Sequence, residues 1–185
     1  MDFKSKEEQY FSWYLEELRE NEFIYSWEYE PFSFNLSEEV RYSYTKRLKT
    51  KSKIMDKVLL HKHEYTPDFV IEWTDKARGV LARHLHEASS TSDIFFLMDD
   101  DRMSYIDIKP NFDKHNMTRL FIVNQKWVFT LYEKYVQKVI ITGSKNALFQ
   151  ATFTPERYLT TDKTGHKRAL EFEPVNLEEF LNLKE

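Results

Sequence analysis

The chain has 185 residues, of which 41% are hydrophobic and only three are glycine, so we expect one compact domain and not a disordered segment. The absence of cysteine excludes disulfides, thiolate metal sites and cysteine nucleophiles, and it suits a reducing, cytoplasmic location. A net charge of −4 gives no overall basic signature for nucleic-acid binding, and we expect no membrane partner because no apolar run is long enough to cross a bilayer.

The first predicted element is an amphipathic helix over residues 3–21. Phe11, Leu15 and Leu18 recur at helical spacing, and Ser5 followed three residues later by Glu8 matches a capping box. Alternating apolar residues then predict a strand within residues 24–36.

Basic residues crowd the segment that follows, which we expect to be a loop or a hairpin arm. They are Lys46, Arg47, Lys49, Lys51 and Lys53. Such a charge run is most often a solvated loop, but it also suits neutralisation of nucleic-acid phosphates. A strand-like segment over residues 54–65 comes next.

The middle of the chain predicts two strands separated by an insertion. Pro67 favours an extended Thr66 and marks entry into a strand over residues 68–73. Residues 75–92 are mostly polar and predict a partly helical insertion. Residues 94–98 and 103–109 predict a hairpin across an acidic turn.

The remainder predicts a helix, a strand and a C-terminal hairpin. Helical spacing over residues 116–134 puts Leu120, Val123, Trp127 and Leu131 on one face, and a strand over 135–142 follows. Residues 149–158 and 166–172 predict a β-hairpin that turns near Gly165. A short helix then begins at Asn176 as N-cap. We expect a single domain over residues 1–185, with a core at about 3–142 and the hairpin and short helix at 149–185.

The residues that indicate chemistry are Asp68, Asp107 and Lys109. On a strand, side chains alternate between faces, so Asp107 and Lys109 project together while Ile106 and Ile108 enter the core on the other side. Charged groups on a central strand are costly unless something compensates them. A hard divalent cation is one such compensation, and Mg²⁺ takes one or two carboxylates plus water. The alternative is that Asp68 belongs only to a turn and that Asp107 and Lys109 are an exposed charge pair.

These motifs resemble those of the PD-(D/E)XK nuclease superfamily. Pro67-Asp68 stands where the family has PD, and Asp107-Ile108-Lys109 stands where it has (D/E)XK. The predicted order of helix, strand, PD strand, DXK strand and helix also agrees, and the opening Ser5–Glu8 is similar to that of phage endonucleases and Holliday-junction-resolvase-like members. The 39 residues between Asp68 and Asp107 imply an insertion between the motif strands.

The resemblance implies an α/β fold with a restriction-endonuclease-like core, in which helices flank a central mixed β-sheet. It implies an endodeoxyribonuclease that uses Mg²⁺, with Mn²⁺ able to substitute, on DNA that is branched, and that acts as a homodimer. Asp68, Asp107 and the Ile108 backbone carbonyl would bind the metal, and Lys109 would position the attacking water.

Two further assignments stay open at this stage. Glu8 is either a fourth catalytic residue and metal ligand or a structural helix cap with Ser5. Gln125 and Lys126 are either auxiliary DNA-binding residues or an ordinary exposed pair on their helix. Two other functions also fit the sequence: a non-catalytic nucleic-acid-binding protein that keeps the nuclease fold, and an interaction protein that docks a partner through aromatic residues.

Overall fold

The computed structural model describes residues 2–87, 94–112, 117–160, 168 and 170–184. Its central feature is a four-stranded mixed sheet in the order β1-β6-β9-β10. β1 and β6 are antiparallel, β6 and β9 are antiparallel, and β10 runs parallel to β9. The strands are β1 (Ile24–Tyr29), β6 (Phe69–Trp73), β9 (Met103–Ile108) and β10 (Val136–Val139).

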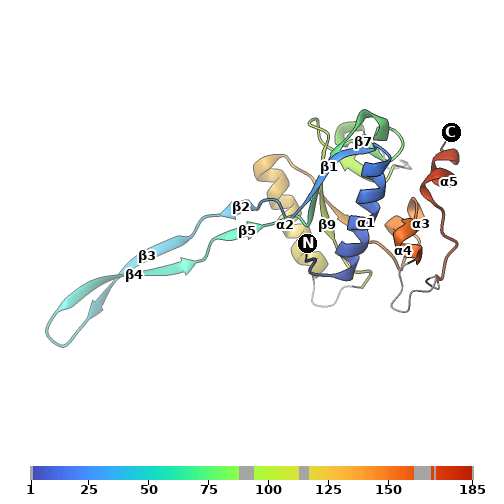
Figure 1. Cartoon of the computed structure of the whole chain (residues 1–185). Coiled ribbons are helices and arrows are strands. Elements are labelled where there is room, and N and C mark those ends of the chain that lie inside the picture. Colours follow the sequence, from blue (N-terminus) through green and yellow to red (C-terminus); the bar gives the residue numbers. More distant parts are fainter. Residues whose placement is uncertain (1, 88–93, 113–116, 161–167, 169, 185) are drawn as a thin grey trace.

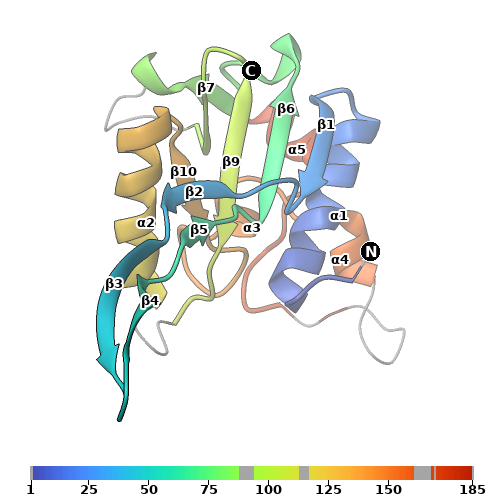
Figure 2. The ribbon, with the colours of Figure 1, turned by 90° about the vertical axis from the view of Figure 1, so that its left-hand side faces the viewer.

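Two helices flank the sheet, as Figure 2 shows. α1 (Lys6–Glu20) covers one face, and α2 (Met117–Tyr132) packs against β10 and the strand β2 (Phe34–Ser37). The predicted helix, the capping box of Ser5 and Glu8, and the buried stripe of Phe11, Leu15 and Leu18 are all confirmed in α1. The coarse expectation of an α/β fold with helices around a central mixed sheet is therefore confirmed.

The core has two parts because the sheet buries both of its faces. Odd-numbered residues of β6 and even-numbered residues of β9, such as Ile71 and Ile106, pack in the larger cluster with α1. Val70 and Tyr105 have the opposite parity and pack in a smaller cluster beneath α2, with Phe121 and Val128. The expected inward position of Ile106 and Ile108 is thus confirmed, as both are buried.

A long β-hairpin leaves the body between β2 and β6 (Figure 1). We call it the arm: β3 (Val40–Arg47) and β4 (Ser52–Leu60) pair antiparallel along their length. Every β3 residue is exposed, and the arm contributes none of the buried core. At its base β2 pairs with β5 (His63–Tyr65), and these two strands lie across the front of the sheet (Figure 2). The basic segment therefore belongs to a hairpin arm, in which Lys46, Arg47 and Lys53 lie on the strands and Lys49 and Lys51 lie in the loop at the tip.

The expected single strand within residues 24–36 is divided. Glu30 takes a positive φ of 46° and Pro31 has no N–H to donate, so β1 ends at Tyr29. β1 joins the main sheet while β2 joins β5 at the base of the arm.

The insertion between the motif strands forms short elements of its own. β7 (Ala82–His84) pairs in parallel with β8 (Phe96–Met98), and two 3₁₀ turns, Asp75–Ala77 and Leu85–Glu87, adjoin β7. The expected hairpin of residues 94–98 with 103–109 is wrong in its pairing. The acidic turn does close through Asp99 N–H donating to the Met103 carbonyl, but the ladder partner of β8 is β7.

The predicted C-terminal β-hairpin is also wrong. Residues 149–158 belong mainly to α3 (Leu148–Ala151) and α4 (Glu156–Thr160), and none of the described residues of 166–172 lies in a strand. The consecutive side chains Leu148 and Phe149 are both buried, which a strand with one buried face cannot achieve. Gly165 lies outside the described residues. The short helix α5 (Leu177–Asn182) with Asn176 as its N-cap is confirmed.

The helix α2 forms as predicted, but the face expected from Leu120, Val123, Trp127 and Leu131 points to solvent. These four side chains are between 38% and 58% exposed. The side that contacts the body carries Phe121, Asn124 and Val128 instead. None of the helices in the described part of the chain combines the length and apolar composition that crossing a bilayer requires.

Candidate functional site

Two neighbouring strands bring Asp68 and Asp107 together. In the antiparallel pair of β6 and β9, Phe69 lies opposite Ile106 and Val70 opposite Tyr105. One further step along this register places Asp68 opposite Asp107. The Asp68 side chain reaches β9 directly, because the backbone N–H of Ile108 donates to Asp68 Oδ2 at 2.6 Å.

Asp107 is the most buried member of the site, with 3% of its surface exposed. Its Oδ1 forms an ion pair with Lys109 Nζ, which confirms that both side chains project from the same face of β9. Its Oδ2 accepts a hydrogen bond from the Tyr65 hydroxyl. Burial and the charge of Asp107 both raise the pKa of Tyr65, so the phenol stays protonated and remains a donor.

Sequence reasoning missed Tyr65. It ends β5 at the base of the arm and is 8% exposed. The only available signal was its position three residues before Asp68 on a strand-like segment, and nothing local predicts a contact with a residue 42 positions later.

Asp68 has an unusual protonation behaviour that follows from its surroundings. Burial raises its pKa, the charge of Asp107 raises it further, and the hydrogen bond from Ile108 and the charge of Lys109 lower it, with a net result of about 7. Glu8 adds a smaller upward effect. Asp68 therefore titrates near neutral pH in the absence of a cation.

Glu8 is the N-terminal helix cap and also lies near the site. Its Oε2 accepts hydrogen bonds from the backbone N–H groups of Lys4 at 2.8 Å and Ser5 at 3.3 Å, and from the Tyr29 hydroxyl at 2.7 Å. The structural cap role is thus confirmed. All of these contacts use one oxygen, and within the described part of the chain Oε1 has no hydrogen-bond partner. The cap therefore does not exclude a second role for Glu8.

The charges at this place leave a negative excess that a divalent cation would balance. Glu8, Asp68 and Asp107 face Lys109 inside the site, and the charge of Lys4 near Glu8 and Asp68 is already paired with Glu30. Within the described residues no three His, Cys, Asp or Glu side chains are grouped as a ready-made metal cage. Mg²⁺ does not need one, because it commonly binds through one or two carboxylates and keeps several waters. The donor set of Asp68 and Asp107 fits that requirement.

The predicted DNA-binding residues fall into two groups. Lys46, Arg47, Lys49, Lys51 and Lys53 lie in the outer half of the arm and are all exposed. Gln125 instead donates its amide to the Val136 carbonyl at 2.6 Å and so ties α2 to β10, while Lys126 is exposed. Their helix approaches the site through Phe121, whose ring centroid lies 5.7 Å from Lys109 Nζ.

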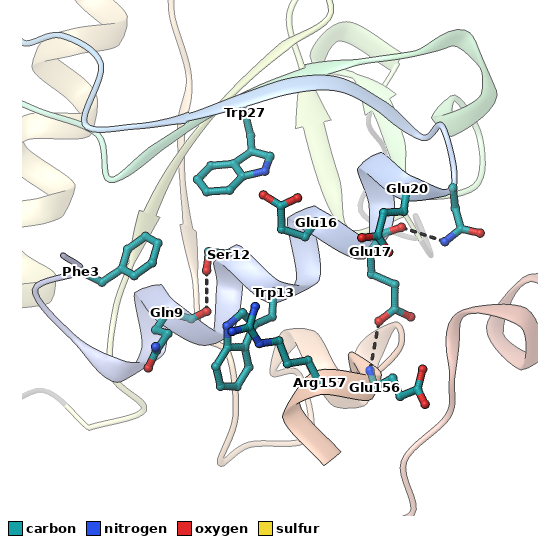
Figure 3. Close-up of a pocket in the computed structure, with 11 residues that line it drawn as sticks. Phe3, Gln9, Ser12, Trp13, Glu16, Glu17, Glu20, Trp27, Glu156 and Arg157 are labelled. Atoms are coloured by element: carbon teal, nitrogen blue, oxygen red, sulfur yellow. Dashed lines mark hydrogen bonds between the residues drawn. The ribbon is translucent and has the colours of Figure 1, made fainter. Parts of the chain in front are cut away.

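A large pocket lies elsewhere, between α1, Trp27 and α4 (Figure 3). It encloses about 790 Å³. Its charged lining consists of Arg157 and four carboxylates, Glu16, Glu17, Glu20 and Glu156. Such a lining repels phosphate, and none of the predicted site residues belongs to it.

Comparison with known proteins produced no match: no family model, no curated protein and no solved structure is significantly similar to the chain. What the chain does must therefore be inferred from the chemistry of its own residues.

Proposed function

We propose that the chain is a Mg²⁺-dependent endonuclease of the PD-(D/E)XK type that hydrolyses phosphodiester bonds in DNA, with a preference for branched DNA. One observation carries the proposal: adjacent strands hold Asp68 opposite Asp107, and Lys109 lies against Asp107 in the same site. Two carboxylates can hold a metal ion that assists phosphodiester hydrolysis, and a neighbouring lysine can stabilise the charge that develops on the phosphate.

Each residue has a distinct role in this proposal. Asp68 and Asp107 bind Mg²⁺ or Mn²⁺, with the Ile108 carbonyl and the second oxygen of Glu8 as further ligands. The bound metal supplies a water of lowered pKa at the site. Lys109 holds the attacking water and balances the charge that develops on the phosphate. Tyr65 fixes the orientation of Asp107 through its hydrogen bond.

We also propose that the active species is a homodimer. Cutting both strands of a duplex calls for two active sites, and α2 offers an exposed apolar surface for a second copy. Half of the α2 residues carry large apolar side chains that are exposed, including Leu120, Val123 and Trp127. Apolar patches of this kind on a monomer commonly mark an interface, and a two-fold dimer is the commonest assembly.

A direct assay tests the nuclease. Labelled four-way junction, flap, duplex and single-stranded DNA are incubated with wild-type protein in Mg²⁺ and in EDTA. We expect cleavage only in Mg²⁺, fastest on branched DNA, and its loss in Asp107→Ala. The matched control is Asp100→Ala, which removes a carboxylate that is 87% exposed on the acidic turn. Full Mg²⁺-dependent cleavage by Asp107→Ala would refute the assigned site.

One observation favours a second candidate, a non-catalytic DNA-binding protein. Both oxygens of Asp107 already have protein partners, Tyr65 and Lys109, so the site is partly satisfied without a metal. Calorimetric titration separates the two functions. A nuclease binds Mg²⁺ at this site and loses that binding in Asp68→Ala, whereas a non-catalytic protein binds DNA with no Mg²⁺ binding that depends on Asp68.

A further inference from the structure

We propose that one face of the arm binds the backbone of duplex DNA flanking the cut, and that this face is made of Tyr42, Tyr44, Lys46, Lys53 and Lys57. The inference rests on the proposed function, since it names the part of the substrate that the arm holds. The basic residues in the sequence do not by themselves distinguish the two faces of the hairpin or duplex from single-stranded DNA, whereas the proposed face does both.

The arm carries a charge opposite to that of the rest of the chain. Residues 40–60 include seven Lys or Arg residues and one Asp, a net charge of +6. Because the whole chain carries −4, the remainder carries −10. A polyanion is therefore attracted to the arm and repelled by most of the body. Figure 1 shows the arm extending away from that body.

The strand register divides the arm into two unlike faces. Tyr42 pairs with Lys57, Tyr44 with Met55, and Lys46 with Lys53. Paired residues of antiparallel strands project to the same side, so these six side chains share one face, which we call the lysine face. The opposite face contains the pairs Arg41–Val58, Ser43–Asp56, Thr45–Ile54 and Arg47–Ser52.

The two faces also differ in how their charges are paired. On the opposite face one of the two arginines, Arg41, forms an ion pair with Glu39 at 2.6 Å, and Asp56 accepts a hydrogen bond from Ser43 at 2.6 Å. The lysine face has no acidic residue. In the part of the chain that the structure describes, Lys46, Lys53 and Lys57 have no ion-pair partner, so their charges are available to phosphates.

The two tyrosines give the lysine face further binding groups. Their rings lie 6.0 Å apart, and Tyr42 and Tyr44 are 42% and 40% exposed without contributing to the core. Tyrosine hydroxyls and lysine ammonium groups are typical donors to DNA phosphates. A two-stranded ribbon also has the width that the major groove admits.

The dimensions of the arm indicate how much duplex it can reach. Its return strand leads through β5 directly to Tyr65 and Asp68, so the arm is joined to the candidate catalytic residues. The chain from Thr50 at the tip to Tyr65 is 15 residues long and at about 3.3 Å per residue spans at most about 50 Å. At about 3.4 Å per base pair this corresponds to roughly 15 base pairs.

Matched double variants test the choice of face. Fluorescence anisotropy measures binding of the full chain to a labelled duplex of about 30 base pairs in EDTA, as a function of salt. We expect Lys46→Gln/Lys53→Gln to weaken binding about tenfold and to reduce the salt slope by about 2, because two phosphate contacts are lost. Arg41→Gln/Arg47→Gln removes the same formal charge from the opposite face and should weaken binding less than about threefold.

Duplex length provides a second readout. Wild-type affinity should fall when the duplex is shortened from about 20 to about 10 base pairs, and the lysine-face variant should lose most of that length dependence. Tyr42→Ser/Tyr44→Ser should weaken binding with no change in charge. Because all of these side chains lie outside the core, thermal melts should be unchanged.

The outcomes distinguish the arm proposal from the proposed function. If the two double variants weaken binding equally, the lysine face is not the DNA-binding face. The same conclusion follows if the chain binds single-stranded DNA more tightly than duplex and its affinity for duplex does not depend on duplex length. Loss of self-association in the lysine-face variant with DNA binding intact would also overturn the lysine face, and it would assign the arm to a second copy. Arm-dependent duplex binding without Mg²⁺-dependent cleavage of any DNA would support the arm and refute the nuclease.

Discussion

In the proposed nuclease, a metal ion bound at Asp107 would compete with Lys109 for Oδ1 of that carboxylate. The ammonium group of Lys109 pairs with Asp107 Oδ1 inside the site, where the Lys109 side chain is only 14% exposed. A cation that binds this oxygen must displace Lys109 from it. We therefore expect Lys109→Met to bind Mg²⁺ about tenfold more tightly than wild type in calorimetric titration, while DNA cleavage is lost.

The matched control for Lys109 is Lys138. It lies beside Asp107 in the register of β10 and β9, but its side chain is exposed. Lys138→Met removes the same charge from a neighbouring position without removing a contact of Asp107, so its effect on Mg²⁺ affinity should be smaller. Weaker Mg²⁺ binding by Lys109→Met than by wild type would contradict the competition.

Asp68 makes the stability of the metal-free protein depend on pH. Its pKa is about 7 in the folded chain and 3.8 by ordinary reference, so the folded state binds the proton more tightly than the unfolded state does. The stability that this group contributes is complete below about pH 4 and is lost as the pH rises towards 7. At pH 8 in EDTA, Asp68→Asn should therefore raise the free energy of unfolding, by about 1 to 4 kcal/mol.

Urea unfolding at two pH values measures this effect and provides its own control. The difference between Asp68→Asn and wild type should shrink as the pH falls and disappear at about pH 3, below the ordinary pKa of 3.8, where Asp68 is protonated in both states. Added Mg²⁺ should stabilise wild type at pH 8 but not Asp68→Asn. An Asn variant that is less stable than wild type at pH 8 would show that the ionised carboxylate is favourable where it lies.

At the scale of elements, sequence patterns predicted what is decided locally. The capping box of Ser5 and Glu8 involves residues three apart, and it forms in α1. Strand alternation placed Asp107 and Lys109 on one face and Ile106 on the other, because that parity is a property of one strand. The candidate site could therefore be predicted in its central part.

Features that depend on distant neighbours could not be predicted in this way. The apolar residues of α2 cover more than one face, and only the position of the sheet decides that Phe121 is buried and Leu120 is exposed. The prediction of a C-terminal hairpin was wrong because Leu148 and Phe149 both pack into the same core, which outweighs the alternation of apolar and polar residues around Phe149. Tyr65 meets Asp107 only because the base of the arm crosses the sheet.

At the scale of the whole molecule, the separation of charge bears on how a substrate approaches. The arm carries +6 and the remainder of the chain −10, so long-range attraction to a polyanion such as the proposed DNA substrate would act at the end of the molecule that leads to Tyr65 and Asp68. The acidic pocket between α1 and α4 belongs to the remainder and adds to the repulsion there. The proposed DNA substrate would thus be drawn to the arm before it reaches the candidate catalytic residues.

The exposed face of α2 provides the test of assembly. Leu120 and Val123 are 58% and 49% exposed on the same side of the helix, so Leu120→Glu/Val123→Glu should leave the fold intact but place two charges per copy in a two-fold interface. Size-exclusion chromatography with light scattering should show wild type as a dimer, at twice the chain mass of 22.5 kDa, and the double variant as a monomer of 22.5 kDa. Ile54→Glu, on the arm at 73% exposure, is the matched apolar-to-acidic control and should remain dimeric. A wild type that stays monomeric at every concentration, or a double variant that still dimerises, would show that α2 is not the surface joining two copies.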